Sequence, residues 1–326
     1  MNVIFLGTPD FAVGALQRMH KAGFNIVACI SQPDREKDRK GKLLFTPVKI
    51  AALELGLKVL QPNNVNDQIN IIKNLEPDIM VTVAFGQILS DEFLSIAPVF
   101  NVHGSLLPKY RGSSPIQTAI INGDKFAGIT IMKTIRKMDA GDIILKGKMV
   151  IEDTDTYGTL HNKLSVVGAD LIVKALQQFG NKKEKYIVQD ESKVIFTKKV
   201  LKQDGEIDFT NSAIELERKV RAYSPWPSTF IKLENGENVK IHEVKVHKMQ
   251  SMPDITSHTL GGLDKNYFKN ASVGDIFITS KKDKIFVKCK KDFLELINIQ
   301  AAGKSKMNAV DFLRGNSLPL NLQNKK

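Results

Sequence analysis

The sequence predicts an α/β domain with a doubly wound, mostly parallel sheet, followed by a small β-barrel of the OB-fold type. Over the first two-thirds of the chain, short β-branched runs alternate with helical stretches, which is the pattern of a doubly wound sheet. Near 198–208 this alternation gives way to short strands with Gly-rich turns, which is typical of small barrels. The 326 residues are enough for two domains. We expect a catalytic domain at 1–200, the barrel at 201–317 and a tail at 318–326.

In the first domain, strands are expected at short apolar or β-branched runs, and helices are expected between them. The helix at 157–179 has the clearest periodicity, because Leu160, Leu164, Val167 and Leu171 fall on one face. The predicted strands are 2–6, 25–30, 58–60, 78–84, 100–103, 128–133 and 143–151. The predicted helices are 11–22, 47–55, 67–74, 115–122 and 157–179.

In the second domain, one further helix precedes a series of strands. The helix is expected at 212–222. The predicted strands are 229–233, 238–246, 276–279, 285–288 and 293–300. Several short strands within about 100 residues favour a small barrel such as an OB-fold.

The composition is that of a globular protein of a reducing compartment. Hydrophobic residues make up 42% and charged residues 25% of the chain, both ordinary values. Cys29 and Cys289 lie far apart and form no CxxC pair, so no disulfide framework or zinc site is indicated. No apolar run approaches the roughly 18 residues of a membrane span. We expect a cytoplasmic monomer that requires no metal and contacts no membrane.

The charge of the chain indicates a polyanionic partner. The formal net charge is +12, and the shorter segment 205–326 has half of this excess. Basic charge without acidic blocks favours nucleic acid as the partner. A Lys-rich surface that reflects genome composition is the alternative interpretation.

The chemistry is predicted from the segment 101–112 and a carboxylate-rich turn at 138–142. Asn101 and His103 are two residues apart at the end of an apolar strand, so they share one face. An amide can stabilise an oxyanion, an imidazole can move a proton, and a carboxylate from Asp139 or Asp142 can stabilise the charged imidazole. Together these groups suit a carbonyl that becomes tetrahedral. On pattern alone, a structural Asn and His are the more common outcome.

Other motifs exclude or extend this interpretation. Gly7 and Gly14 are too far apart for a dinucleotide-binding loop, and the chain has no P-loop and no nucleophile elbow. The segment 31–42 is a turn-rich loop with many Lys and Arg residues. It is either a solvated surface loop or an arm that grips phosphates.

Several of these segments resemble the methionyl-tRNA formyltransferase family. The signature Asn101-Val102-His103-Gly104-Ser105-Leu106-Leu107-Pro108, with Tyr110-Arg111-Gly112, marks the wider formyltransferase superfamily. The other resembling segments are 5–11, 32–35, 46–49, 83–89, 221–227 and 302–304. The basic loop and the C-terminal segments narrow the resemblance to the tRNA enzyme. It implies a Rossmann-like formyltransferase domain and transfer of a formyl group from 10-formyltetrahydrofolate to methionine on initiator methionyl-tRNA.

The resemblance also implies roles for individual residues. The catalytic residues of the family fall on Asn101, His103 and Asp139, with Asp142 as the rival carboxylate. The family usually has Thr where this chain has Ala140. The co-substrate would be held by backbone groups of Phe85, Gly86, Gln87, Ile88, Leu89, Ser105, Leu106, Leu107 and Pro108. The tRNA would be contacted by Arg39, Lys40 and Lys42, and Lys40 replaces a Gly that is common in the family.

Other function classes share parts of this pattern. A formyltransferase for a small amine, such as glycinamide ribonucleotide or an amino sugar, would share the Asn–His–Asp site but would not need the basic barrel or loop. A folate-binding hydrolase would use water as the acceptor. A non-enzymatic RNA-binding protein would keep the barrel without the three catalytic residues.

Overall fold

The computed structural model describes residues 1–36, 43–233, 236–251, 255–256, 271–279 and 283–315. The chain divides into two compact units, each of which is described by itself. The first unit comprises Met1–Ile116, Lys125–Ile151 and Thr159–Lys199, and the second comprises Gln117–Asp124, Glu152–Gly158 and Val200–Lys326. The predicted tail at 318–326 lies outside the described residues.

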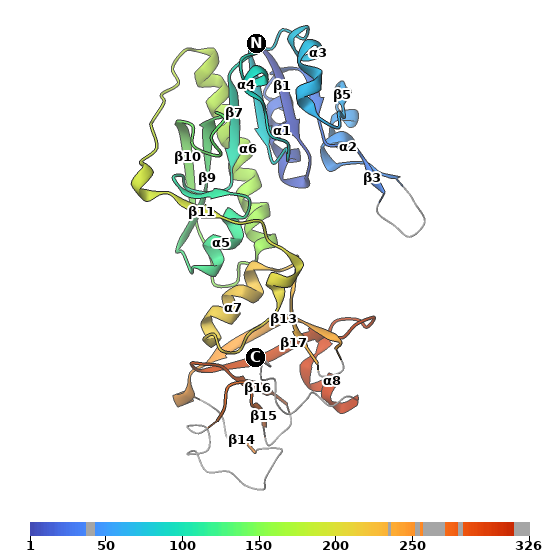
Figure 1. The fold of residues 1–326 in the computed structure, drawn as a ribbon, viewed down its shortest axis with the longest axis vertical. Helices are drawn as coiled ribbons and strands as arrows, with labels where there is room; N and C mark the ends of the chain where they lie inside the picture. Colours follow the sequence, from blue (N-terminus) through green and yellow to red (C-terminus); the bar gives the residue numbers. More distant parts are fainter. Residues whose placement is uncertain (37–42, 234–235, 252–254, 257–270, 280–282, 316–326) are drawn as a thin grey trace. The chain divides into compact units, whose positions relative to one another are not determined.

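The first unit is built on one seven-stranded sheet, whose order is β10-β9-β7-β6-β1-β2-β5 (Figure 1). Its strands are β1 (Asn2–Gly7), β2 (Asn25–Ile30), β5 (Val59–Leu60), β6 (Ile79–Val83), β7 (Val99–His103), β9 (Phe126–Lys133) and β10 (Ile143–Val150). The first five are parallel to one another, whereas β9 runs antiparallel to both of its neighbours, β7 and β10. The predicted mostly parallel sheet is therefore confirmed.

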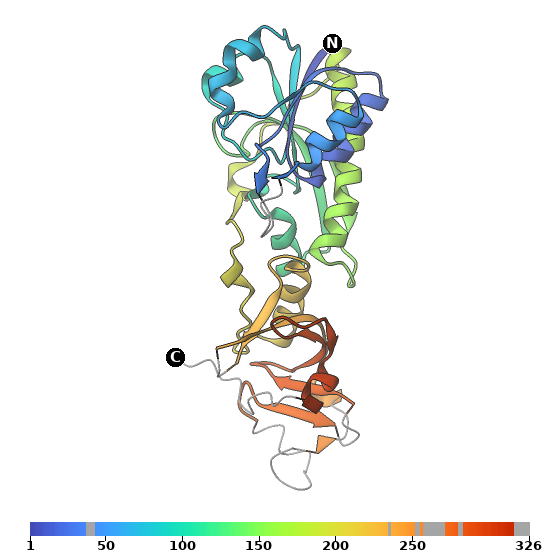
Figure 2. The ribbon, with the colours of Figure 1, turned by 90° about the vertical axis from the view of Figure 1, so that its right-hand side faces the viewer.

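Helices cover both faces of this sheet, as Figure 2 shows. One face is covered by α1 (Asp10–Lys21), α2 (Pro47–Glu54) and α6 (Tyr157–Gly180), and the other by η1 (Val65–Gln68), α3 (Ile69–Lys73) and α4 (Asp91–Leu94). Phe100 of β7 packs edge-on against Phe179 of α6, with ring centroids 5.6 Å apart. Because successive side chains of a strand point to opposite faces, Asn101 and His103 lie on the face away from α6.

The element boundaries follow local signals in the sequence. Thr46 accepts a hydrogen bond from the Lys49 amide and caps α2, which begins at Pro47. The predicted helix at 67–74 is shorter in the structure, because a 3-10 turn occupies Val65–Gln68 before α3. α5 (Pro115–Ile121) ends within one residue of its prediction. Elements that were not predicted include β8 (Lys109–Gly112) and β11 (Ile195–Thr197), which pair in parallel, and the short pair β3 (Arg35–Glu36) and β4 (Leu43–Leu44).

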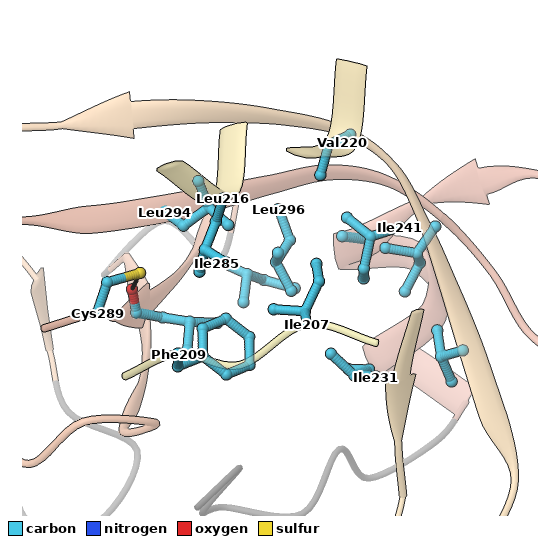
Figure 3. Close-up of a cluster of buried hydrophobic side chains, with 14 of the residues drawn as sticks. Ile207, Phe209, Leu216, Val220, Ile231, Ile241, Ile285, Cys289, Leu294 and Leu296 are labelled. Atoms are coloured by element: carbon cyan, nitrogen blue, oxygen red, sulfur yellow. Dashed lines mark hydrogen bonds between the residues drawn. The ribbon is translucent and has the colours of Figure 1, made fainter. Parts of the chain in front are cut away.

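The second unit is built on an antiparallel sheet, against which helices of its described part pack. Its helices are α7 (Ala213–Ala222) and α8 (Ala309–Gly315), and its strands, in order, are β12 (Thr229–Lys232), β13 (Asn238–His247), β17 (Phe293–Gln300), β16 (Ile285–Lys288), β15 (Ile276–Thr279) and β14 (Ile255–Thr256), with β18 (Met307–Asn308) beside β17. Leu216 of α7 and Leu296 of β17 meet in one buried cluster (Figure 3). The predicted change to a domain built mainly from short strands is confirmed. Among the described strands, no pairing joins β12 to β14.

The two cysteines give a first prediction. Cys29 and Cys289 are both buried, and burial raises the pKa of each thiol to about 12. Because the thiolate is the reactive form, we expect neither thiol to react with a thiol reagent near pH 8 in the native protein. Both should react fully in denaturant. Stoichiometric labelling of the native protein would contradict this expectation.

No helix in the described part of the chain is both long and apolar enough to cross a membrane.

Candidate active site

Asn101 is held with its amide group in one orientation. It is opposite Thr82 in the register of β6 and β7, and the Thr82 hydroxyl donates to Asn101 Oδ1 at 2.9 Å. This hydrogen bond occupies the amide oxygen, so the NH₂ group of Asn101 is the end that can serve a ligand as a donor. Thr82 is itself buried, which keeps water from competing for the contact.

His103 follows on the same face of β7, and its ring is buried. Its Nε2 lies 2.9 Å from the carbonyl oxygen of Tyr110, which can only accept, so Nε2 has the proton. Its Nδ1 lies 3.7 Å from Asp139 Oδ2. Tyr110 has a φ of 67°, an uncommon conformation for an aromatic residue. The ring is therefore fixed at one nitrogen and faces a carboxylate with the other.

Asp139 reaches His103 from a loop that folds back along the sheet. β9 is antiparallel to β7, with Thr130 opposite His103 and Lys133 opposite Phe100, so the chain has already passed His103 when β9 ends. The following loop returns far enough for Asp139 Oδ2 to accept a hydrogen bond from the Gly112 amide at 2.8 Å. The structure thus brings together the three residues that the sequence singled out.

Asp142, the rival carboxylate, has different surroundings. Burial raises the pKa of Tyr186, and the nearby carboxylates of Glu184 and Asp142 raise it further. Within the described residues, the ion pair of His103 is with Asp139. The geometry therefore favours Asp139 as the partner of the imidazole.

Two buried polar residues that the sequence did not single out support this loop. The Arg111 side chain is fully buried, and the Gln189 side chain links it to the backbone around Asp139. Arg111 is part of the signature at 101–112, but the sequence predicted no role for it. Gln189 lies between predicted elements, where no periodicity or spacing marks it.

The segment 85–89 follows β6 at the same sheet edge as the end of β7. The carbonyl oxygen of Phe85 accepts hydrogen bonds from the Thr8 hydroxyl at 3.0 Å and from Gln32 Nε2 at 3.3 Å. The side chains of Phe85 and Leu89 are buried in the core. These two side chains anchor the segment in the core, so they are not available to contact a ligand.

The middle of this segment offers free backbone donors. The Gln87 side chain accepts from the Val65 amide at 2.7 Å, so it ties the segment to its neighbour. The Ile88 side chain is 74% exposed. Among the described residues, no acceptor is paired with the backbone N–H groups of 86–89. Such an edge can bind a planar ligand through its main chain.

The segment Ser105–Pro108 uses more of its polar groups internally. Thr130 Oγ1 donates to the Ser105 carbonyl at 2.7 Å and accepts from the Leu107 amide at 3.1 Å. The Leu107 side chain is fully buried, whereas Leu106 and Pro108 are half-buried. This segment therefore has few free hydrogen-bonding groups for a ligand, and we expect it to contribute mainly van der Waals contacts.

The predicted tRNA-contacting residues of the basic loop lie outside the described residues. These are Arg39, Lys40 and Lys42. The base of the loop is described: Asp34 accepts a hydrogen bond from Gln61 at 2.8 Å and pairs with Lys49. Burial opposes ionisation of Asp34, yet these contacts lower its pKa. The loop thus begins from a fixed, charged anchor.

The described residues contain no group of three or more His, Cys, Asp and Glu side chains that could hold a metal ion.

Known proteins resemble the chain over nearly its whole length. The family described as formyl transferase matches residues 1–176, and its C-terminal domain matches residues 199–317. The chain is 39% identical to a methionyl-tRNA formyltransferase of Lysinibacillus sphaericus, over 98% of both chains. It is 38% identical to the methionyl-tRNA formyltransferase of Agathobacter rectalis, over 97% of this chain and 96% of the other.

A solved structure shares the fold at lower identity. It is an N-formyltransferase from Helicobacter canadensis in complex with folinic acid and dTDP-3-aminofucose. The TM-score is 0.64 at 19% identity, over 92% of this chain and 98% of the other. At this identity the similarity shows the fold alone.

Proposed function

The chain belongs to the methionyl-tRNA formyltransferase family, and from this membership we propose how its site carries out formyl transfer to methionyl-tRNA. The single observation that supports the proposal best is the convergence of Asn101, His103 and Asp139. The acceptor in our proposal is the α-amino group of methionine on initiator tRNA. The donor is 10-formyltetrahydrofolate.

The chemical step needs one bond made, one bond broken and one proton moved. The amine nitrogen attacks the formyl carbon, and the carbonyl oxygen becomes an oxyanion. The amide NH₂ of Asn101 and the protonated imidazole of His103 stabilise this oxyanion. Asp139 stabilises the charged imidazole and accepts the proton of the amine, directly or through water. The bond between the formyl carbon and the donor nitrogen then breaks, and that nitrogen gains the proton.

The donor is proposed to lie against the segments 85–89 and 105–108. The free backbone N–H groups of 86–89 suit the polar edge of a pterin, since a pterin presents acceptors and donors in one plane. The exposed Ile88 side chain offers an apolar contact beside them. The C-terminal domain and the loop with Arg39, Lys40 and Lys42 are proposed to bind the tRNA, because they contribute dense basic charge. Because charged tRNA is the acceptor, we place the enzyme in the cytoplasm, and we propose that it acts as a monomer.

A transfer assay with competing acceptors tests this function. The purified chain would be given 10-formyltetrahydrofolate with charged initiator tRNA, glycinamide ribonucleotide or a nucleotide-linked amino sugar. We expect formyl transfer to the tRNA alone. Comparable transfer to either small amine would overturn the assignment of the acceptor.

Alanine variants of the basic loop test its proposed role at fixed salt. If the loop grips the acceptor end, a single position should dominate the loss of turnover, because misplacement by about 1 Å can cost ~10²-fold in rate. We expect that position to be Arg39. Equal, small losses at Arg35, Lys37, Arg39 and Lys40 would indicate a solvated loop with only diffuse electrostatic effects.

A further inference from the structure

We propose that Gln189 is a positioning residue, which holds the Asp139 loop so that its carboxylate faces His103. The inference rests on the proposed role of Asp139 in the transfer. Gln189 does not touch the reacting groups. It acts through the backbone of the loop that presents Asp139.

The donor end of Gln189 fixes the loop at two points. Gln189 Nε2 donates to the carbonyl oxygens of Asp139 at 2.8 Å and of Gly141 at 2.7 Å. Both protons of the amide nitrogen are thereby used. Two hydrogen bonds on either side of Ala140 define the turn in position and in orientation.

The acceptor end of Gln189 is fixed in turn by Arg111. Gln189 Oε1 accepts from Arg111 Nε at 3.1 Å and from Arg111 Nη2 at 2.9 Å. The fork of the guanidinium therefore determines which end of the amide is the oxygen and which is the donor. Both side chains are buried: Arg111 is 0% and Gln189 is 5% exposed.

Arg111 lies in the chain between the two residues that hold His103 and the Asp139 carboxylate. Its neighbour Tyr110 supplies the carbonyl oxygen for His103 Nε2, and its neighbour Gly112 supplies the amide for Asp139 Oδ2. Three successive residues of β8 thus hold the imidazole, the loop and the carboxylate. Because β8 is hydrogen-bonded to β11, these three residues belong to a two-stranded sheet and not to an unpaired loop.

The loop needs such support because its backbone is under constraint. Asp139 has a φ of 48°, in the left-handed region that non-glycine residues rarely adopt. A Cβ added at Gly141 would lie 1.7 Å from the Lys133 carbonyl oxygen, so the turn lies directly on the end of β9. Without the two hydrogen bonds, the backbone of the turn loses the restraint that directs the Asp139 carboxylate toward His103, and the contact with the Gly112 amide holds only its Oδ2.

Two substitutions separate this role from simple space filling. Gln189→Glu keeps the size and strengthens the pairing with Arg111, but it places a carboxylate oxygen against two carbonyl oxygens. Gln189→Met keeps the approximate volume and removes both polar ends. We expect kcat on charged tRNA to fall about 10- to 10²-fold in each variant, with KM changed less than about threefold, because only the geometry of the chemical step is lost.

Glu191→Gln provides the matched control. Glu191 is the other partner of Arg111, at 2.7 Å from Nη2, but its side chain is 58% exposed, and its hydrogen bonds among the described residues are with Arg111 and Lys137. Hydrogen bonds from Arg111 and Lys137 lower the pKa of Glu191 to about 2, so the wild-type side chain is charged at neutral pH. We expect kcat of this variant to stay within about twofold of wild type.

A double-mutant cycle with Asp139→Asn decides between positioning and general structural damage. If Gln189 acts through Asp139, either Gln189 substitution should add less than about twofold to the loss already caused by Asp139→Asn. The inference would be overturned if the loss of kcat in a double variant equals the product of the two single losses. A normal kcat in both single Gln189 variants would overturn it as well. If Gln189→Glu fails to fold, Gln189→Met supplies the same cycle. Near-normal turnover of Asp139→Asn alone would instead contradict the proposed function of Asp139.

Discussion

Replacing Asn101 or His103 by alanine is expected to lower kcat for formyl transfer by about 10²- to 10³-fold, with tRNA affinity and folding nearly unchanged. Asn101 provides a donor to the developing oxyanion and His103 provides a positive charge beside it, and loss of one oxyanion-stabilising group costs about this factor in other enzymes. Neither substitution removes a large apolar contact, because both side chains face the site and not the α6 side of the sheet. The effect should therefore appear in turnover and not in stability.

Single-turnover formylation with saturating charged tRNA would measure this loss. Thr82→Val is the informative companion variant, since it retains the volume of Thr82 and removes the hydrogen bond that orients the Asn101 amide. We expect it to lower kcat less than Asn101→Ala does. Near-normal turnover of either alanine variant would show that the oxyanion is stabilised elsewhere.

Most of the fold could be predicted because its elements have strong local signals. The parallel strands are buried on both faces and appear as continuous apolar runs, and α6 has a clear helical period. The pair β8 and β11 could not be predicted. Its two strands are only four and three residues long, and they are separated by more than 80 residues of chain. Short strands that pair at such a distance leave no periodicity in the sequence.

The site was predictable in its residue types and not in its geometry. The two-residue spacing placed Asn101 and His103 on one face, because a strand has a period of two. No such rule applies to the loop after β9, and Asp139 and Asp142 both remained candidates by spacing. The structure separates them through contacts made by distant residues, such as Gln189 and Gly112. Support of this kind depends on tertiary structure alone.

The nature of the acceptor follows from the whole chain and not from the site. The N-formyltransferase solved with folinic acid and dTDP-3-aminofucose shares the fold at a TM-score of 0.64 over 92% of this chain, so the fold by itself does not discriminate between acceptors. The identity of 38–39% to two methionyl-tRNA formyltransferases extends through the second domain. The basic charge of the second domain suits an acceptor that is a polyanion.

Asp139→Asn is expected to lower kcat by about 10²- to 10³-fold, whereas Asp142→Asn should lower it by less than about fivefold. The asparagine can still accept a hydrogen bond from the Gly112 amide, so the loop should keep its place. It cannot stabilise a charged imidazole or accept a proton, and general acid–base catalysis is typically worth 10²- to 10⁴-fold. The carboxylate of Asp142 raises the pKa of Tyr186, whereas among the described residues the ion pair of His103 is with Asp139.

The two variants are matched, since each removes one negative charge from the same turn. A long-range electrostatic effect on the polyanionic tRNA would therefore be similar in both, and only a direct role at His103 would separate them. The comparison is best made as kcat on charged tRNA at two salt concentrations, because screening weakens the shared long-range part. Equal losses that shrink together at high salt, or a larger loss for Asp142→Asn, would show that Asp139 is not the carboxylate of the reaction.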